Sequence, residues 1–223
     1  MDLFGLGIAI FYFLIISKSY EWICKINRKE QIVFLCYTGI SVFILEEIIT
    51  LVFSNSFALS KFLFPLVVYL YLRKLKKSEK YKAIFISLLL SLLYHSTHTF
   101  ISVTLSSITG DEVVLHYKST FLLVVLLMTY FSILIIIRYF YLEIKYFDKD
   151  YLYPFFKKVI VAFFTLHIVL LISDIVSTFP HLNSFGSILA AIIFICLLLC
   201  FFAMNSHKVQ VEKEIALKQK KFE

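Results

Sequence analysis

The sequence predicts an all-α polytopic membrane protein with about seven transmembrane helices, followed by a cytoplasmic signalling helix. Hydrophobic residues make up 61% of the 223 residues, and the mean hydropathy is +0.89, whereas a soluble domain is roughly half apolar. The apolar residues form long runs separated by short polar loops, and a run of about 20 residues suffices to cross a bilayer. These runs do not alternate in polarity, so they predict helices rather than barrel strands.

Seven apolar stretches meet the length requirement for a span. They cover residues 3–23, 31–53, 57–72, 83–105, 120–142, 155–179 and 185–204. The third stretch is the weakest because it is short, contains Pro65 and has Lys61 near its outer end. It is kept as a span with a possible kink, since removing it would place the basic loops on opposite sides of the membrane.

Positive charge sets the predicted orientation. Of the 22 lysines and arginines, 20 fall on one side of a seven-span arrangement, and Lys61 and Lys118 fall on the other. Cytoplasmic loops gather lysine and arginine, which predicts an outside N-terminus and an inside C-terminus. The net charge of +7 therefore lies in membrane-flanking loops, where it contacts anionic lipid headgroups. No nucleic-acid partner is expected.

Residues 1–204 are predicted to be the transmembrane domain, and residues 205–223 the start of the cytoplasmic signalling helix. The tail is polar, has no glycine or proline, and continues directly from the last span. Two series of residues repeat there every seven positions, which predicts a weak, half-polar coiled-coil seam and a homodimer. They are Met204, Val211 and Lys218, and Lys208, Ile215 and Phe222. The alternative is a solvated helix that does not pair. The chain stops without a helix cap, so it is expected to be part of a longer protein.

Ionisable residues inside a bilayer are costly and commonly mark function. Glu46 and Glu47 lie in the outer half of the second span and Asp174 near the outer end of the sixth, while Asp111 and Glu112 lie in an outer loop. With His98, midway along the fourth span, they are predicted to form a ligand-binding cavity that opens outward. Such an acidic cavity suits a cationic amphipathic ligand. The alternative is that these acids are interfacial residues that snorkel or pair with the two outer lysines.

Catalytic and metal-binding patterns are incomplete. The pair Glu46–Glu47 resembles the paired glutamates of CAAX-type intramembrane proteases, but their motif requires an arginine four residues later, where Leu51 stands. His95 and His98 share a helix face, as metal ligands do, but they need further ligands at the same depth. Histidines that pack between helices and bond to hydroxyl groups are therefore expected. No metal or catalytic residue is assigned.

Cysteine usage does not predict a disulfide framework. None of the four cysteines falls in an outer loop, and they are interpreted as buried structural thiols. They are Cys24, Cys36, Cys196 and Cys200.

Several segments together resemble the ComD family, the receptor histidine kinases for competence-stimulating peptide, which are related to the Agr-type quorum sensors of Gram-positive bacteria. These segments are MDLFGLG, INRKE, LLLSLLYHSTHTFISVTLSSITGDE, YFDKDYLYPFFKKV, HLNSFGSIL and the tail FFAMNSHKVQVEKEIALKQKKFE. They extend over nearly all of the chain.

The resemblance implies a polytopic sensor in a bacterial cell membrane that binds a linear, cationic, helix-forming peptide pheromone. In that family a dimerisation helix with the phosphoacceptor histidine and an ATP-binding domain follow the sensor. This chain ends before both, so ATP, Mg²⁺ and contact with a cognate response regulator are expected of the absent kinase domain. His207 lies at the membrane exit and is not in the phosphoacceptor motif. A polytopic transporter or an intramembrane enzyme is the alternative.

Overall fold

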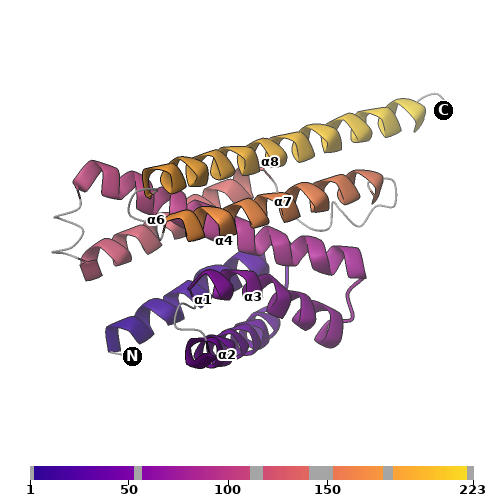
Figure 1. Ribbon diagram of the computed structural model, residues 1–223. Coiled ribbons are helices and arrows are strands. Elements are labelled where there is room, and N and C mark those ends of the chain that lie inside the picture. The colour runs from indigo at the N-terminus through magenta and orange to yellow at the C-terminus, as the bar shows by residue number, and fades with distance from the viewer. Residues whose placement is uncertain (1–2, 53–56, 111–117, 141–152, 178–182, 220–223) are drawn as a thin grey trace.

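The computed structural model describes residues 3–52, 57–110, 118–140, 153–177 and 183–219, and these ranges contain helices and no β-strand. The predicted all-α class is therefore confirmed (Figure 1). The elements are α1 Leu3–Cys24, α2 Arg28–Val52, α3 Phe57–Leu70, the π-helix η1 Tyr71–Leu75, α4 Lys80–Thr109, α6 Lys118–Tyr139, α7 Tyr153–Ser177 and α8 Asn183–Gln219.

Three of the described helices are long and apolar enough to cross a membrane. They are Lys80–Thr109, Lys118–Tyr139 and Phe185–Gln219. The fold is thus that of an α-helical protein suited to membrane insertion. Each of the other four predicted spans also falls on a helix, but seven spans and their orientation remain predictions.

Helix α4 lies at the centre of the bundle. It contacts α1, α3, α6, α7 and α8, whereas α2 lies outside and packs on α1, α3 and η1 (Figure 1). All residues from 85 to 97 in α4 are buried. The surrounding helices therefore shield the middle of α4 from its environment.

The polar content of α4 explains this central position. Its middle carries Ser87, Ser91, His95, Ser96 and Thr97, all of them buried. Polar side chains are costly in contact with lipid, so a helix that carries several of them is favoured inside a bundle. By contrast, the outer helices turn large apolar side chains outward. Examples are Phe131 of α6, Val161 of α7 and Leu199 of α8, all more than half exposed.

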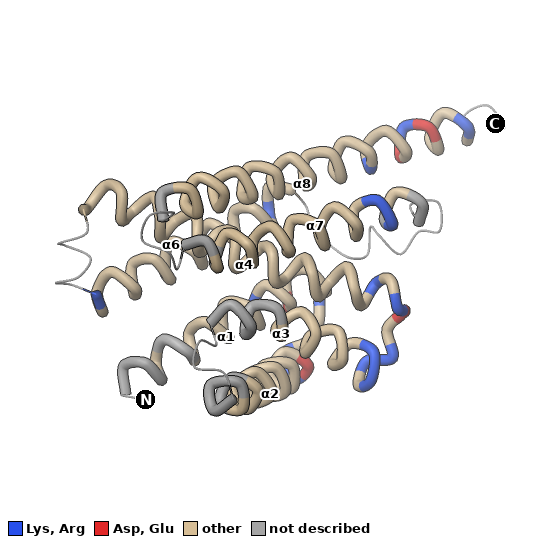
Figure 2. Tube along the Cα trace, in the orientation of Figure 1, with Lys and Arg blue, Asp and Glu red and all other residues tan. Residues whose placement is uncertain are grey.

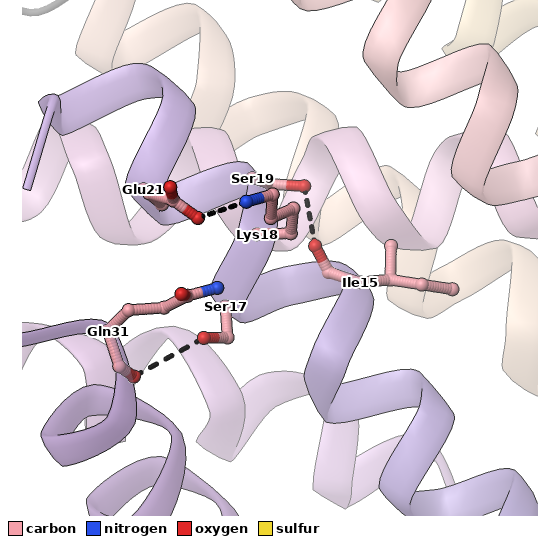
Figure 3. Close-up of polar contacts among 6 residues, drawn as sticks. All are labelled: Ile15, Ser17, Lys18, Ser19, Glu21 and Gln31. Atoms are coloured by element: carbon pink, nitrogen blue, oxygen red, sulfur yellow. Dashed lines mark hydrogen bonds and ion pairs between the residues drawn. The ribbon is translucent and has the colours of Figure 1, made fainter. Parts of the chain in front are cut away.

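The connection between α1 and α2 is ordered by short-range polar contacts. The Asn27 side-chain oxygen accepts a hydrogen bond of 2.9 Å from the Glu30 amide, which caps the start of α2. The Ser17 hydroxyl donates to the Gln31 carbonyl at 3.3 Å and so links the two helices (Figure 3). Lys18, near the end of α1, forms an ion pair of 2.6 Å with Glu21 (Figure 3).

A π-helix follows α3 and leads into the lysine-rich loop of residues 76–79, which precedes α4. Proline removes one backbone hydrogen bond from a helix, yet α3 continues through Pro65 as far as Leu70. The backbone hydrogen-bond pattern changes only after Leu70, where the π-helix η1 begins. Tyr71, its first residue, is fully buried, and the centroid of its ring lies 5.2 Å from that of Phe34. Within η1, the Arg73 side chain donates a hydrogen bond of 2.5 Å to the Ser78 carbonyl and closes the loop that follows.

Basic side chains gather toward one end of the bundle. Figure 2 shows lysines and arginines around η1 and the start of α4, at the start of α7 and along the last turns of α8. Lys118, the first residue of α6, lies at the opposite end. Lys76 of the basic end is also paired with Glu30 of α2. Among the described residues, most lysines and arginines thus lie toward the same end of the bundle, as their distribution along the sequence predicts.

Candidate functional site

The acidic residues predicted to bind a ligand are distributed across the bundle. Glu46 and Glu47 lie in the last turns of α2, and Asp174 lies in the last turn of α7. In the part of the chain that the structure describes, α2 and α7 do not contact each other, because α3 and α4 lie between them. Asp111 and Glu112 lie outside the described residues. Direct packing of α2 on α7 therefore does not bring these acids together.

His98, the remaining predicted ligand-binding residue, belongs to a cluster of aromatic rings around α4. It is half-buried, and its ring stacks on that of Tyr94, one helical turn earlier, with centroids 5.5 Å apart. Tyr94 in turn meets Tyr12 of α1 edge-on at 4.5 Å. This contact joins α1 to the central helix α4.

His95 belongs to the same group of rings, and its side chain is only 5% exposed. Its ring lies 6.2 Å from Tyr12 of α1 and 6.2 Å from Phe64 of α3. We call Tyr12, Phe64, Tyr94, His95 and His98 the aromatic–histidine cluster. Edge-to-face ring contacts of this kind contribute to packing beyond the area they bury, so the cluster fixes how α1, α3 and α4 meet.

The histidines are not arranged as a metal centre within the described ranges. No group of three or more histidine, cysteine, aspartate or glutamate side chains there is suited to hold a metal ion. His167 of α7 lies beside Ser87 and Leu88 at the junction of α3, α4 and α7. The Ser96 hydroxyl donates to the Leu92 carbonyl of its own helix.

Sequence reasoning missed the aromatic partners of the histidines. Tyr12 and Phe64 lie 83 and 31 positions before His95 in the chain, and each belongs to a helix that is apolar over most of its surface. Nothing in such a helix specifies which side meets α4. The only available signal was the presence of a large aromatic residue near the middle of each of these helices.

Contacts at three levels connect α7 to α8. The Ser173 hydroxyl, near the end of α7, donates a buried hydrogen bond of 2.8 Å to the Gly186 carbonyl, near the start of α8. In the middle, the rings of Phe163 and Phe201 meet edge-on with centroids 6.0 Å apart. At the basic end, Phe155 stacks on His207 at 4.2 Å. The two helices therefore form a continuous antiparallel pair.

The tail continues the last span as a single helix. Helix α8 contains 37 residues and projects beyond the start of α7 (Figure 1). Met204 is buried, Lys208, Val211 and Ile215 are half-buried, and Lys218 is exposed. These residues belong to the two series predicted from the sequence, and the half-polar character of the seam is retained along the tail.

Comparison with protein-family models, curated proteins and solved structures finds no match to this chain. The architecture and its three long apolar helices define an α-helical protein suited to membrane insertion. The family resemblance in the sequence remains the basis for any more specific function.

The hydrogen bond between α7 and α8 gives a testable prediction. Replacing Ser173 with alanine removes an interhelical bond, and such bonds stabilise membrane helix bundles by about 0.6 kcal/mol on average and at most about 2. Ser173→Ala should lower the free energy of unfolding by an amount in this range, measured by denaturation in mixed micelles. Ser19→Ala is the matched control because the Ser19 hydroxyl is also buried but bonds to the Ile15 carbonyl of its own helix. Equal losses in both variants would contradict the role of the interhelical bond.

Proposed function

We propose that this chain is the membrane sensor portion of a two-component sensor histidine kinase that binds an extracellular cationic peptide pheromone and signals for competence or quorum sensing. The observation that carries the proposal is the unbroken α8, which combines a membrane-suited segment with a polar tail. Its 37 residues rise about 55 Å at about 1.5 Å per residue. A hydrocarbon core of about 30 Å leaves roughly 25 Å of helix beyond it.

The proposed arrangement has seven spans in a bacterial cell membrane, with the N-terminus outside and the C-terminus inside. The basic end of the bundle supports this orientation because lysine and arginine are retained on the cytoplasmic side. The tail then enters the cytoplasm. There it leads toward the dimerisation helix and the ATP-binding domain of the parent kinase, which pairs as a homodimer and phosphorylates a response regulator.

The separation of the acidic residues defines the shape of the proposed ligand. Glu46 and Glu47 on α2 and Asp174 on α7 belong to helices that are not in contact. An elongated, amphipathic peptide reaches both helices by lying across the outer ends of those between them. Its basic side chains are attracted by the acids, including Asp111 and Glu112 of the outer loop, while its apolar face meets the helix ends. His98 is the deepest of the proposed contacts.

The α7–α8 pair provides the proposed route for the signal. A peptide that displaces the end of α7 also displaces the start of α8 through the Ser173–Gly186 hydrogen bond. Because α8 is continuous, the movement reaches the cytoplasmic tail without an intervening loop. The half-polar seam of the tail is a marginal coiled coil, which suits an element with two arrangements of similar free energy.

Cysteine labelling tests the orientation. In a background without native cysteines, single cysteines at Asn55, Thr109 and Asn183 should react with a membrane-impermeant maleimide applied to intact cells. Cysteines at Asn27 and Ser78 should react only after the membrane is permeabilised, because the positive-inside rule places the basic loops in the cytoplasm. Labelling at Ser78 in intact cells would rule out the seven-span arrangement.

Removal of acidic charge tests ligand recognition. Glu46→Gln, or Asp174→Asn, should raise the half-maximal peptide concentration at least about 30-fold, since losing one partner of a desolvated charge pair costs about 2 kcal/mol or more. Glu112→Gln in the outer loop should raise it less than about fivefold, as expected for an exposed pair. The control is Glu79→Gln at the basic end, where the side chain is exposed. A normal response from all the outer variants, at normal surface levels, would refute the acidic binding site.

Interrupting α8 tests transmission. Two glycines inserted after Ser206 of the parent kinase should break the helix and abolish peptide-dependent phosphorylation, while peptide binding stays unchanged. An insertion of seven alanines at the same position is the control, because it keeps the helix and adds about two full turns, so the heptad phase is retained. Binding and phosphorylation are measured on the same membranes. A glycine variant with an unchanged dose response would show that α8 is only a tether.

A further inference from the structure

An apolar groove lies on the surface of the bundle between α3, α4 and α7. Its volume is about 390 Å³. Ser87 and Leu88 of α4 form its floor and are almost fully buried, whereas Leu66 of α3 and Phe164 of α7 form its walls and are 45% and 51% exposed. The groove therefore opens to the surroundings of the bundle rather than into its interior.

A lysine of α7 lies two helical turns before the lining residue Phe164, toward the basic end of the bundle. The Lys157 Nζ atom lies 5.8 Å from the centre of the Tyr81 ring, so that the start of α7 meets the start of α4. Lys157 precedes Phe164 by seven residues and so lies on the same face of α7, about 10 Å along the helix axis. Tyr81 precedes Ile84, another groove residue, by three positions on α4.

Further positive charge surrounds this position. Lys80 and Lys82 flank Tyr81 in the first turn of α4, and Lys158 follows Lys157 on α7 (Figure 2). The apolar groove thus has a group of lysines toward one of its ends. Tyr81, an aromatic residue with a polar hydroxyl, lies beside these lysines. Tyrosines are common where a membrane protein meets lipid headgroups.

We propose that the groove binds one anionic phospholipid, with an acyl chain between α3 and α7 and the headgroup phosphate at Lys157. A narrow groove with apolar walls matches a single hydrocarbon chain, and clustered lysines at the membrane surface attract anionic headgroups. The lipid joins three helices of the bundle at a position distinct from the proposed peptide site. The inference needs only that the bundle lies in a membrane, so it does not depend on peptide binding.

Lipid retention by the purified chain tests the proposal. The chain is extracted in mild detergent, mixed with equal amounts of phosphatidylglycerol and phosphatidylcholine of matched acyl chains, and analysed by native mass spectrometry. The wild-type chain should retain one phosphatidylglycerol in preference to phosphatidylcholine. An excess of inorganic phosphate should leave this lipid in place, because phosphate lacks the acyl chain. Displacement by phosphate would show a surface anion site without a contribution from the groove.

Two pairs of variants separate the acyl chain from the headgroup. Leu66→Trp fills the groove and should reduce retention of both lipids several-fold, whereas Leu70→Trp, on the same helix but outside the groove, should not. Lys157→Gln should reduce phosphatidylglycerol retention about fivefold and leave phosphatidylcholine unchanged, as expected for one lost cation near a membrane surface. Lys213→Gln, at an exposed position on the tail of α8 outside this lysine cluster, is its matched control. Because Lys157 is exposed, we expect Lys157→Gln to fold normally, so it tests the proposal even if Leu66→Trp does not fold.

Three results would overturn the proposal. The first is equal retention by Leu66→Trp and Leu70→Trp, and the second is equal retention of the two lipids by the wild-type chain. The third is a wild-type dimer without bound lipid that Leu66→Trp converts to monomer, which would assign the groove to a second copy of the chain. All three are read without peptide, so the lipid site and the proposed sensor function succeed or fail separately.

Discussion

The high cost of exposing polar groups to lipid explains the arrangement of this bundle. Helix α4 carries five buried polar residues within the segment 85–97, and five other helices surround it. In a soluble protein the same helix would be stable with its hydroxyls turned toward water. In a membrane the favourable position is the centre, and the more uniformly apolar α6, α7 and α8 are left to face the lipid.

The central position of α4 has a mechanical consequence. His95 lies against rings from α1 and α3, and Tyr94 meets Tyr12 of α1, so these helices are fixed to α4 through the aromatic–histidine cluster. Helices α7 and α8 are fixed to each other by the Ser173 hydrogen bond and by ring contacts at two further levels. A displacement of α1 or α3 is therefore passed to α4, and a displacement of α7 is passed to α8. This property supports the proposed sensor, in which outer loops without a domain of their own require signals to travel through helices.

The two ends of the bundle differ in the kind of interaction they offer. At the basic end, the described loops are tied by an Asn27 cap, by the Arg73 bond to Ser78 and by the pair Lys76–Glu30. The proposed lipid site belongs to this end, where lysines adjoin an apolar groove. At the other end the proposed ligand contacts lie on helices separated by their neighbours. We therefore propose different roles for the two ends, with lipid binding at the basic end and an extended ligand at the other.

The sequence by itself determined the helical class and the positions of the helices. The predicted stretch 3–23 became α1, and the tail joined the last span as α8, because a chain in lipid satisfies its backbone hydrogen bonds within each helix. The sequence also singled out His95 and His98, because ionisable residues in apolar runs are conspicuous, and both lie in the aromatic–histidine cluster. The part of His98 in ligand binding stays a prediction. Only the tertiary structure decided that α4 is central, that α2 and α7 lie apart, and that Tyr12 and Phe64 meet His95. Those features depend on the rotation and neighbours of each helix, which packing between distant segments sets and which a helix apolar on nearly all sides does not encode.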